Sequence, residues 1–585
     1  MTDKIVWDLT TIYESDELLD KDLIKVENNL EKIEKLKEDI EKNIVDILLL
    51  DADTSRFLEK AYAYAHMKKD EDANVGKYQK LDTKVMNLYN KYITKLSFLV
   101  PYLLSLPEEE ANKLKNDKKL KDFDIALMKV FRKREHTLSD KEEKVISTLS
   151  SARETASNMY YYLTNVDMKF PYLEKWDRQI TNVNFTNIQT EEDRELREVS
   201  FKEFYNTYNQ FGNTIAQSYY SHVDAVVKIS QLKNYDNVRK MFLFNDDVDE
   251  KVYDTLIDSV HKYLPSMHKY YEIKKRTLGL DEQHMYDVYM SIAPDFEKKY
   301  SWEEAKALVI ESVKPLGEEY VEIYKKAFDE KWIDAEIRDG KRGGAYSSGS
   351  YDTKPFILMN FDETLNSLFT LAHEMGHSLH SYYDRHNNSY LHSGYTIFVA
   401  EVASTFNEAL LLNLLLNRAQ TIEEKIYLTD FYINSYKSTV FRQTMFAEFE
   451  REVHKRIESG EVLTKDDFSK LYLELNKKYF GAAMVSDEEI SYEWMRIPHF
   501  YSNFYVYKYA TGFAASSILA KRVIKEEEGS RENYIKFLKD GAKHFPIEQL
   551  KIAGVDMSKP ETVNQSLEIF KNLVDTLDNM LKKGE

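Results

Sequence analysis

Apolar residues recur at helical spacing through most of this chain. In the first of these segments, steps of three and four predict a long amphipathic helix with a lysine and glutamate outer face; its apolar positions are Leu19, Leu23, Val26, Leu30, Ile33, Ile40 and Ile44. Residues 51–55 are polar, and Thr54 or Ser55 can cap a following helix, so we expect a break there. Further helices are predicted over residues 78–98 and after Ser139, which opens a capping box with Glu142.

The pattern changes between residues 167 and 185. Residues 169–173 and 180–185 have the composition of short strands, and helical periodicity resumes near Glu191. A chain of 585 residues exceeds one hydrophobic core, so we predict an N-terminal helical lobe over residues 1–188 and a second lobe over residues 189–585. With only 17 Gly and 10 Pro the fold should be mostly α. The long helices could form a coiled coil, but frequent turns favour antiparallel packing within a larger body.

One helical segment contains the candidate chemistry. Its buried face is predicted at Leu365, Leu368, Ala372, Met375 and Leu379, with Asp362 and Thr364 as possible caps. His373 and His377 are four residues apart, so both rings project from one side of the helix and can share a Zn²⁺ ion. Glu374 can take a proton from water at that metal. The alternative interpretation is a helix with two surface histidines.

A catalytic zinc needs a third protein ligand. The metzincin pattern requires Gly at 380 and His at 383, but this chain has His380 and Tyr383, which excludes that class. The apolar segment 397–408 contains Glu401, which we predict as the third ligand. Glu408 lies on the same helical face and can orient a ligand histidine; a capping or ion-paired role is the alternative. A site with three protein ligands has no place for a third histidine, so we predict that His380 lies next to the ligands and does not bind the metal.

Three motifs together resemble a known family. His373–Ser378 (His-Glu-Met-Gly-His-Ser), the segment 398–408 and Arg496–Tyr501 (Arg-Ile-Pro-His-Phe-Tyr) are similar to the oligoendopeptidase F branch of the thimet-oligopeptidase-like zinc peptidases. The resemblance runs from about Trp7 to the C-terminus. It implies one zinc ion per chain and hydrolysis of internal bonds in short peptides. It also implies a two-lobed helical body with a deep central channel and a small β-sheet beside the active-site helix.

Two other segments are candidates for binding the peptide. The only Gly-rich stretch contains Gly343, Gly344, Ala345 and Tyr346, lacks a phosphate-loop pattern and precedes a predicted strand at residues 355–360. Small residues at a sheet edge let a substrate backbone pair with it, and the resemblance supports this; a plain hairpin turn is the alternative. The loop between the two ligand helices holds His392 and Gly394, and a glycine there suits a flap over the cleft.

The segment 498–509 is rich in tyrosine. Peptide hydrolysis develops an oxyanion, which phenol and imidazole groups can stabilise by donating hydrogen bonds. The resemblance implies a histidine and a cleft-facing tyrosine here, which match His499 and Tyr509, with Tyr501 as a second donor. The alternative is that these residues fill the core, because the chain has 42 tyrosines.

Composition narrows the remaining possibilities. The net charge of −19, from 100 acidic and 81 basic residues, argues against binding nucleic acid or an anionic membrane. There is no cysteine, so thiol chemistry and thiolate metal sites are excluded. Residues 1–8 show no apolar signal core, and no apolar run approaches the ~18 residues that span a bilayer, so we expect a cytoplasmic protein. Two rival functions stay open: a zinc carboxypeptidase on the same scaffold, and an inactive peptide-binding protein, against which the intact Glu374 argues.

Overall fold

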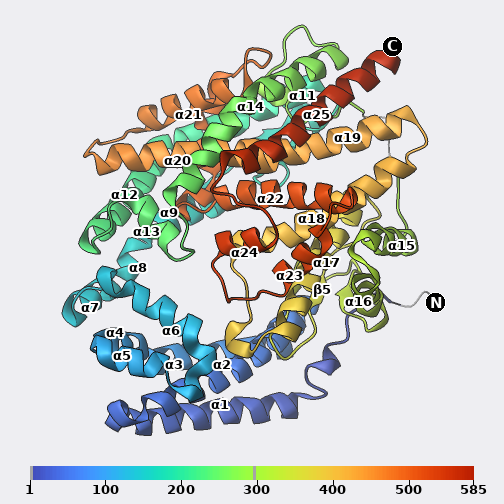
Figure 1. Cartoon of the computed structure of the whole chain (residues 1–585). Helices are drawn as coiled ribbons and strands as arrows, with labels where there is room; N and C mark the ends of the chain where they lie inside the picture. The colour runs from blue at the N-terminus through green and yellow to red at the C-terminus, as the bar shows by residue number, and fades with distance from the viewer. Residues whose placement is uncertain (1–3, 294–297, 585) are drawn as a thin grey trace. The chain divides into compact units, whose positions relative to one another are not determined.

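The computed structural model describes residues 4–293 and 298–584 and is mostly helical, as predicted (Figure 1). The chain forms two compact units. Unit 1 comprises Met1–Thr137, Lys298–Leu414 and Leu519–Val555, and unit 2 comprises Leu138–Glu297, Leu415–Ile518 and Asp556–Glu585. The predicted limit between residues 188 and 189 lies inside unit 2, so the division of the chain at that point stays a prediction.

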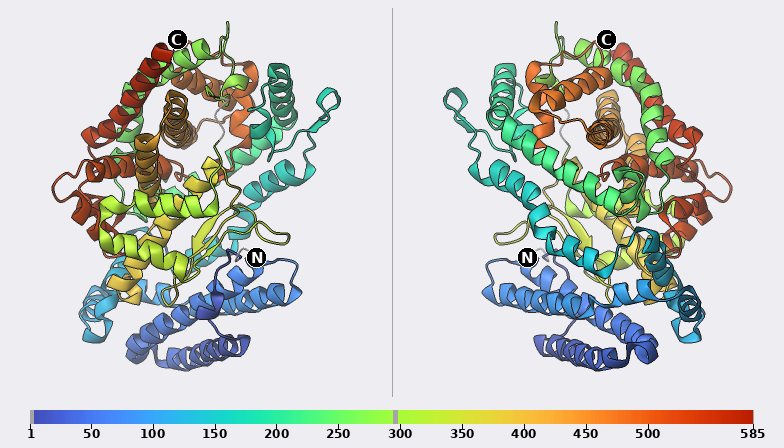
Figure 2. Two further views of the ribbon diagram at one scale, coloured as in Figure 1. Left: turned by 90° about the vertical axis from the view of Figure 1, so that its right-hand side faces the viewer. Right: turned by 90° about the vertical axis from the view of Figure 1, so that its left-hand side faces the viewer.

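Unit 1 combines helices from the start, the middle and the end of the chain. These are α1 (Asp16–Leu36), α2 (Ile40–Glu71), α3 (Gly76–Leu96), α4 (Leu99–Ser105), α5 (Glu108–Lys115), α6 (Asp124–Phe131), α15 (Trp302–Ser312), α16 (Glu318–Asp329), α17 (Leu365–Asn387), α23 (Ser530–Leu538) and α24 (Pro546–Ile552). Two more helices, α18 (Ile397–Arg418) and α22 (Tyr507–Ile524), contribute residues to both units. In both figures the blue helices α1 to α3 lie side by side, which supports packing within a larger body (Figures 1 and 2).

Helix α2 continues through residues 51–55, where the sequence pattern predicted a break, so that prediction is wrong. Thr54 Oγ1 donates a hydrogen bond to the Leu50 carbonyl at 2.5 Å. The hydroxyl group therefore bonds the preceding turn of its own helix instead of capping a new one. The interruption lies earlier, at residues 37–39 between α1 and α2.

A small sheet in unit 1 lies beside α17, as predicted. Its strand order is β3 (Ile333–Asp334), β5 (Phe356–Leu358), β4 (Tyr346–Ser348), with β3 parallel and β4 antiparallel to β5. The three residues of β5 are fully buried, as a central strand covered on both faces should be. Both β4 and β5 contact α17. Strand β4 is at the edge of the sheet, so its outer side has no strand partner among the described residues.

Unit 2 is almost entirely helical. Its helices are α7 (Asp140–Thr148), α8 (Ser150–Arg153), α9 (Thr155–Tyr162), α10 (Phe185–Ile188), α11 (Arg194–Gln210), α12 (Gly212–Leu232), α13 (Val238–Phe244), α14 (Glu250–Thr277), α19 (Ile422–Tyr436), α20 (Arg442–Glu458), α21 (Lys465–Phe480) and α25 (Pro560–Gly584). The capping box predicted before α7 is confirmed.

The strands predicted near the start of unit 2 are shorter than expected. The first is confirmed only as β1 (Tyr172–Leu173), which pairs antiparallel with β2 (Arg178–Gln179). The second prediction, over residues 180–185, is wrong. There Asn184 Oδ1 accepts a hydrogen bond from the Thr181 N–H at 2.8 Å, which closes a turn instead of extending a strand.

Helix α18 is long and apolar enough to cross a membrane, and it is the one such helix among the described residues. However, 72% of its most apolar 18-residue window is buried inside the protein. Its composition is therefore that of a core helix, and it carries Glu401 and Glu408, whose side chains are half-buried.

Candidate active site

Helix α17 begins as the sequence predicts. Thr364 is its N-cap, and the Thr364 side chain accepts a hydrogen bond from the Ser367 N–H at 3.1 Å. Asp362 in turn accepts from the Thr364 hydroxyl at 2.7 Å. The predicted apolar face of the helix is buried. This cap and this face fix where α17 starts and how it is rotated, and thereby which way His373 and His377 point.

Gly376 allows α18 to lie unusually close to α17. A Cβ atom at this position would lie 2.5 Å from the Ala403 carbonyl oxygen, 2.6 Å from Ser404 Cα and 2.7 Å from Asn407 Nδ2. Two of these three neighbours are backbone atoms, which cannot move aside independently of their helix. The glycine between the two histidines therefore sets the distance from α17 to the helix that carries Glu401.

His373, His377 and Glu401 form the one group of three His, Asp or Glu side chains among the described residues that could hold a metal ion; we call it the metal group. The Nε2 atoms of the two histidines are 3.2 Å apart. Glu401 Oε2 lies 3.4 Å from His373 Nε2 and 3.9 Å from His377 Nε2. Ligands bound to one zinc at its usual bond lengths are roughly 3.3 Å apart in tetrahedral geometry, so the three donors fit such an ion.

Two acidic side chains flank the metal group. Glu408 Oε1 lies 2.5 Å from His373 Nδ1, so it fixes the orientation of that ring and leaves Nε2 for a metal. Burial opposes protonation of His373, but the hydrogen bond with Glu408 raises the pKa of this histidine to about 9. The Glu374 side chain is buried, and its Oε2 has no hydrogen-bond partner among the described residues. Burial raises the pKa of Glu374 to about 7, which suits a group that accepts and releases a proton.

Two more histidines were singled out in the sequence: His380, one turn after His377 on α17, and His392, in the loop that follows the helix. His380 is buried, and its ring stacks on Tyr395 at 3.7 Å between centroids. Burial lowers the pKa of His380 to about 3, so the ring is neutral. His392 Nε2 lies 2.6 Å from Asp124 Oδ1, and the N–H of Gly394 donates to Asp384 Oδ2 at 2.6 Å. These contacts tie the loop between α17 and α18 to its surroundings.

The predicted substrate strip leads into the edge strand β4. Gly344 adopts a φ of +82°, a conformation that favours glycine, and Asn360 Nδ2 donates to its carbonyl oxygen at 3.0 Å. The Lys341 side chain anchors the start of the strip, because its ammonium group donates to Asp334 Oδ1 at 2.8 Å and to the Met359 carbonyl at 2.6 Å. Farther along, Ser347 Oγ lies 2.9 Å from Ser378 Oγ on α17. The strip and α17 are therefore joined beside Glu374.

In unit 2, His499 lies with two tyrosines that we call, with it, the aromatic group: His499, Tyr505 and Tyr509. The His499 ring lies 6.2 Å from Tyr509 and 6.4 Å from Tyr505, and the Tyr509 hydroxyl donates to the Tyr505 hydroxyl at 3.5 Å. The sequence analysis did not select Tyr505, although its spacing of four from Tyr509 was a usable signal. Tyr501 lies apart from this group: its ring stacks on Tyr160 at 4.7 Å and its hydroxyl donates to Ser218 Oγ.

Comparisons with known proteins match this chain to one family of peptidases over almost its whole length. The model of "Peptidase family M3" matches residues 187–569, and that of "Oligopeptidase F" matches residues 103–170. Oligopeptidase PepF of Bacillus subtilis is 40% identical over 584 residues, which cover 99% of this chain and 87% of that protein. An oligoendopeptidase F homolog of Lactococcus lactis is 38% identical over 592 residues, which cover 100% of this chain and 98% of that protein. The crystal structure of oligoendopeptidase-F from Enterococcus faecium matches with a TM-score of 0.76 and 32% identity, and covers 97% and 99% of the two chains.

Proposed function

The chain belongs to peptidase family M3, and from this premise we propose that it cleaves short peptides with one zinc ion held by His373, His377 and Glu401. The resemblance drawn from the three sequence motifs is confirmed, because full-length relatives carry the name oligoendopeptidase F. The chain is a metalloendopeptidase that acts on oligopeptides. The identity of its metal and the roles of the individual side chains are what we propose here.

The proposal for zinc rests on the three donor atoms of the metal group. Two imidazole nitrogens and one carboxylate oxygen are the ligands of many hydrolytic zinc sites, which keep a fourth position open. The separations of 3.2, 3.4 and 3.9 Å suit a single small ion. A bound Zn²⁺ supplies Lewis acidity, which makes water nucleophilic near neutral pH.

Glu374 is proposed as the general base. Its unpartnered Oε2 and its raised pKa suit a carboxylate that takes the proton of the attacking water and passes it to the leaving amine. Glu408 is proposed as a positioning residue, because it bonds His373 Nδ1 and touches no other member of the metal group in a described contact.

His499 and Tyr509 are proposed to donate hydrogen bonds to the oxyanion. Burial lowers the pKa of His499, so its ring is neutral and can donate a single N–H, while Tyr509 offers a phenol. The adjacent Tyr505 shares this environment. Tyr501 has less support for such a role, because its hydroxyl is engaged with Ser218 and burial raises its pKa.

Recognition of the peptide backbone is proposed for Gly343, Gly344, Ala345 and Tyr346, because they lead into β4, whose outer edge can pair with an extended chain. His392 and Gly394 are proposed to border the same substrate path. We further propose that the protein acts in the cytoplasm, on free peptides and without nucleic acid or membrane partners. The acidic composition and the absence of cysteine support this, and cell fractionation tests it.

The decisive experiment measures zinc content by mass spectrometry and then hydrolysis of internally quenched peptides blocked at both ends. An endopeptidase cleaves such peptides, whereas a carboxypeptidase does not. Glu374→Gln should keep the zinc and lose nearly all turnover, because an amide cannot accept the proton. Turnover within about tenfold of the wild type would exclude the proposed base. Peptide binding without hydrolysis in the zinc-loaded wild type would favour the inactive binding protein.

A further inference from the structure

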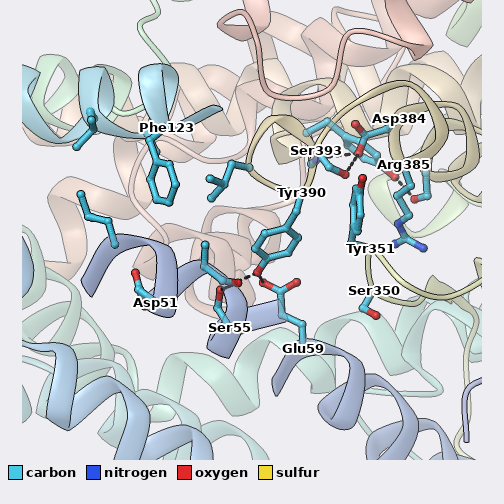
Figure 3. Close-up of a pocket in the computed structure, with 18 of the residues that line it drawn as sticks. Asp51, Ser55, Glu59, Phe123, Ser350, Tyr351, Asp384, Arg385, Tyr390 and Ser393 are labelled. Atoms are coloured by element: carbon cyan, nitrogen blue, oxygen red, sulfur yellow. Dashed lines mark hydrogen bonds between the residues drawn. The ribbon is translucent and has the colours of Figure 1, made fainter. Parts of the chain in front are cut away.

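A cavity of about 670 Å³ opens in unit 1 beside strand β4 (Figure 3). This volume is typical of a ligand pocket. One wall is mainly apolar and comes from α2, α4, α6 and the turn before α6, with Leu103, Phe123 and Leu127 among its residues. The opposite wall is polar and comes from residues 347–351, the second half of α17 and the loop that follows it. Gly394, proposed above to border the substrate path, lies in this lining, but no ligand has yet been assigned to the cavity.

A stripe of polar residues on α17 connects the general base to the cavity. Glu374, Ser378, Ser381 and Arg385 follow one another at steps of four, three and four, so they share one face of the helix. Ser378 contacts Ser347 of β4, and Ser381 Oγ lies 2.9 Å from the Tyr395 hydroxyl. The last two residues of this stripe, Ser381 and Arg385, form part of the lining of the cavity.

Arg385 lacks the partner that a partly buried guanidinium requires. Among the described residues its one hydrogen bond is a long one, 3.5 Å from Nη1 to the Thr353 carbonyl, and no carboxylate oxygen lies within 4.0 Å of its nitrogen atoms. Burial lowers the pKa of Arg385, which reflects the missing counter-charge. An arginine cannot become neutral in a protein, so its charge must be met by an anion or by water.

The carboxylates that line the cavity already have donors. Glu59 Oε1 accepts from the Tyr390 hydroxyl at 2.7 Å, and Asp384 Oδ2 accepts from the N–H of Gly394. Asp51 accepts from the Tyr92 hydroxyl at 2.7 Å. In the view of Figure 3, Tyr351 stands between Arg385 and the bonded pair of Tyr390 and Glu59. Arg385 is therefore the charged group of this cavity whose partner has to come from outside the protein.

Gly349 makes room for this guanidinium. A Cβ atom there would lie 2.9 Å from Arg385 Nη1 and 2.7 Å from the Lys354 carbonyl oxygen, and the residue has a φ of +151°. Gly349 follows β4 directly, so Arg385 lies close to the end of the strand whose edge is proposed to pair with the peptide. Residues 347–349 line the cavity, so a peptide extended along β4 would run toward it.

We propose that Arg385 binds a carboxylate of the peptide substrate about three residues from the cleaved bond. Arg385 follows Glu374 by 11 residues, or about 16 Å along the helix, and its side chain leans back toward the helix N-terminus. The remaining distance of roughly 10 Å equals about three residues of extended peptide. The carboxylate is either the C-terminal group of the peptide or an acidic side chain. This inference rests on the proposed function and assigns part of its substrate specificity.

The first test uses the wild-type enzyme with matched synthetic peptides. Blocked, internally quenched peptides carry either Glu or Gln at the second, third or fourth position on each side of the cleaved bond. A second set ends two to four residues after that bond with either a free acid or an amide. A charge-assisted hydrogen bond predicts a kcat/KM that is roughly tenfold to a hundredfold higher for the acid at one position. Preference in the blocked set identifies a side chain, and preference confined to the free acid identifies the C-terminus. Equal rates for every acid and amide pair would overturn the proposal.

The second test changes the protein. Arg385→Gln should bring the acid-to-amide ratio close to one, while kcat/KM for the amide peptide stays within about threefold of the wild type. Arg385→Lys should keep part of the preference, and Arg531→Gln, which removes an exposed arginine of unit 1 paired with Glu532, should keep all of it. An unchanged ratio in Arg385→Gln, or an equal loss for both peptides, would show that Arg385 does not bind the carboxylate.

Binding measurements separate this proposal from the proposed function. Zinc-loaded Glu374→Gln is expected not to turn substrate over, so the Kd of the acid and amide peptides can be measured directly. The same roughly tenfold to hundredfold ratio is expected there, and it should vanish in Glu374→Gln combined with Arg385→Gln. A Kd ratio near one in Glu374→Gln would overturn the carboxylate site even if hydrolysis is confirmed. A clear ratio without any hydrolysis by the wild type would refute the peptidase function and keep the site.

Discussion

Replacing Gly376 by alanine should damage the metal centre without touching a ligand. The added Cβ would meet the Ala403 carbonyl oxygen at 2.5 Å and Ser404 Cα at 2.6 Å, where ordinary contacts start near 3.4 Å. Relief requires α17 and α18 to separate by roughly 1 Å, because backbone atoms cannot swing aside. Overpacking of this kind typically costs about 1–3 kcal/mol of stability.

The separation also moves Glu401, which lies two residues before Ala403 on the same helix. Metal–ligand distances tolerate deviations of about 0.2 Å, so a shift of this size should weaken zinc binding. We expect a loss of zinc affinity of about tenfold to a hundredfold, comparable to the loss of a group that orients a ligand. Activity measured with excess zinc should recover only in part, because a misplacement of 1 Å can itself lower the rate about a hundredfold.

Competition with a chelator of known affinity measures the zinc affinity, and thermal unfolding of the metal-free protein measures the stability. Gly76→Ala is the matched control, since Gly76 begins α3 and an added Cβ meets nothing within 4 Å. It should leave zinc affinity unchanged. If Gly376→Ala binds zinc as tightly as the wild type and keeps its activity within about threefold, the close approach of α17 and α18 does not set the geometry of the site.

Three further predictions concern single side chains. Glu401→Ala should lower zinc affinity more than Glu408→Ala, and unchanged zinc content in Glu401→Ala under mild chelation would place the third ligand elsewhere. His499→Ala and Tyr509→Phe should each lower kcat by roughly 10²–10³ with little change in KM or zinc content. If kcat is unchanged in both variants, these two residues serve only to pack the core. Burial opposes ionisation of Glu448, but hydrogen bonds from His261, Lys478 and Tyr479 lower its pKa to about 2. Its contribution to stability is therefore present above pH ~4.5 and is lost as the pH falls toward 2, so the stability difference between the wild type and Glu448→Gln should shrink over that range in urea unfolding.

The metal group could be predicted from sequence because each step of the inference was local. The spacing of His373 and His377 fixes their separation on a helix, and the apolar run around Glu401 indicates a largely buried helix on which an acid needs a partner. Gly376 was visible in the same motif, but its effect depends on α18, so only the structure explains why a glycine is needed there. The false break at residues 51–55 arose because a threonine that caps a helix and one that bonds its own preceding turn look alike in sequence.

Local sequence patterns could not predict how the tyrosine segment is arranged or that the cavity exists. Phe504 has a φ of +52°, which turns the chain between His499 and α22, and this turn brings Tyr505 and Tyr509 to the histidine and leaves Tyr501 behind. No periodicity in the sequence marks such a residue. The walls of the cavity come from parts of unit 1 that are hundreds of residues apart, as in the 2.8 Å contact between Ser55 Oγ and the Tyr390 hydroxyl. The sequence alone could not show that Arg385 faces them.

Helix α17 holds the metal ligands on one face and the proposed peptide-binding residues on another. Metal binding and peptide preference can therefore be tested separately. Gly376 and the two ligand histidines face α18, whereas Glu374, Ser378 and Arg385 share the face that meets β4 and the cavity. A change at Gly376 shifts α18 and should lower zinc affinity while keeping the preference for an acidic peptide. A change at Arg385 should remove that preference and keep zinc affinity. The free-energy changes of Gly376→Ala and Arg385→Gln in kcat/KM should then add within about 0.5 kcal/mol in the double variant. A larger coupling would mean that the helix transmits a shift at α18 to the cavity, and that one rigid element sets both the metal geometry and the position of the peptide.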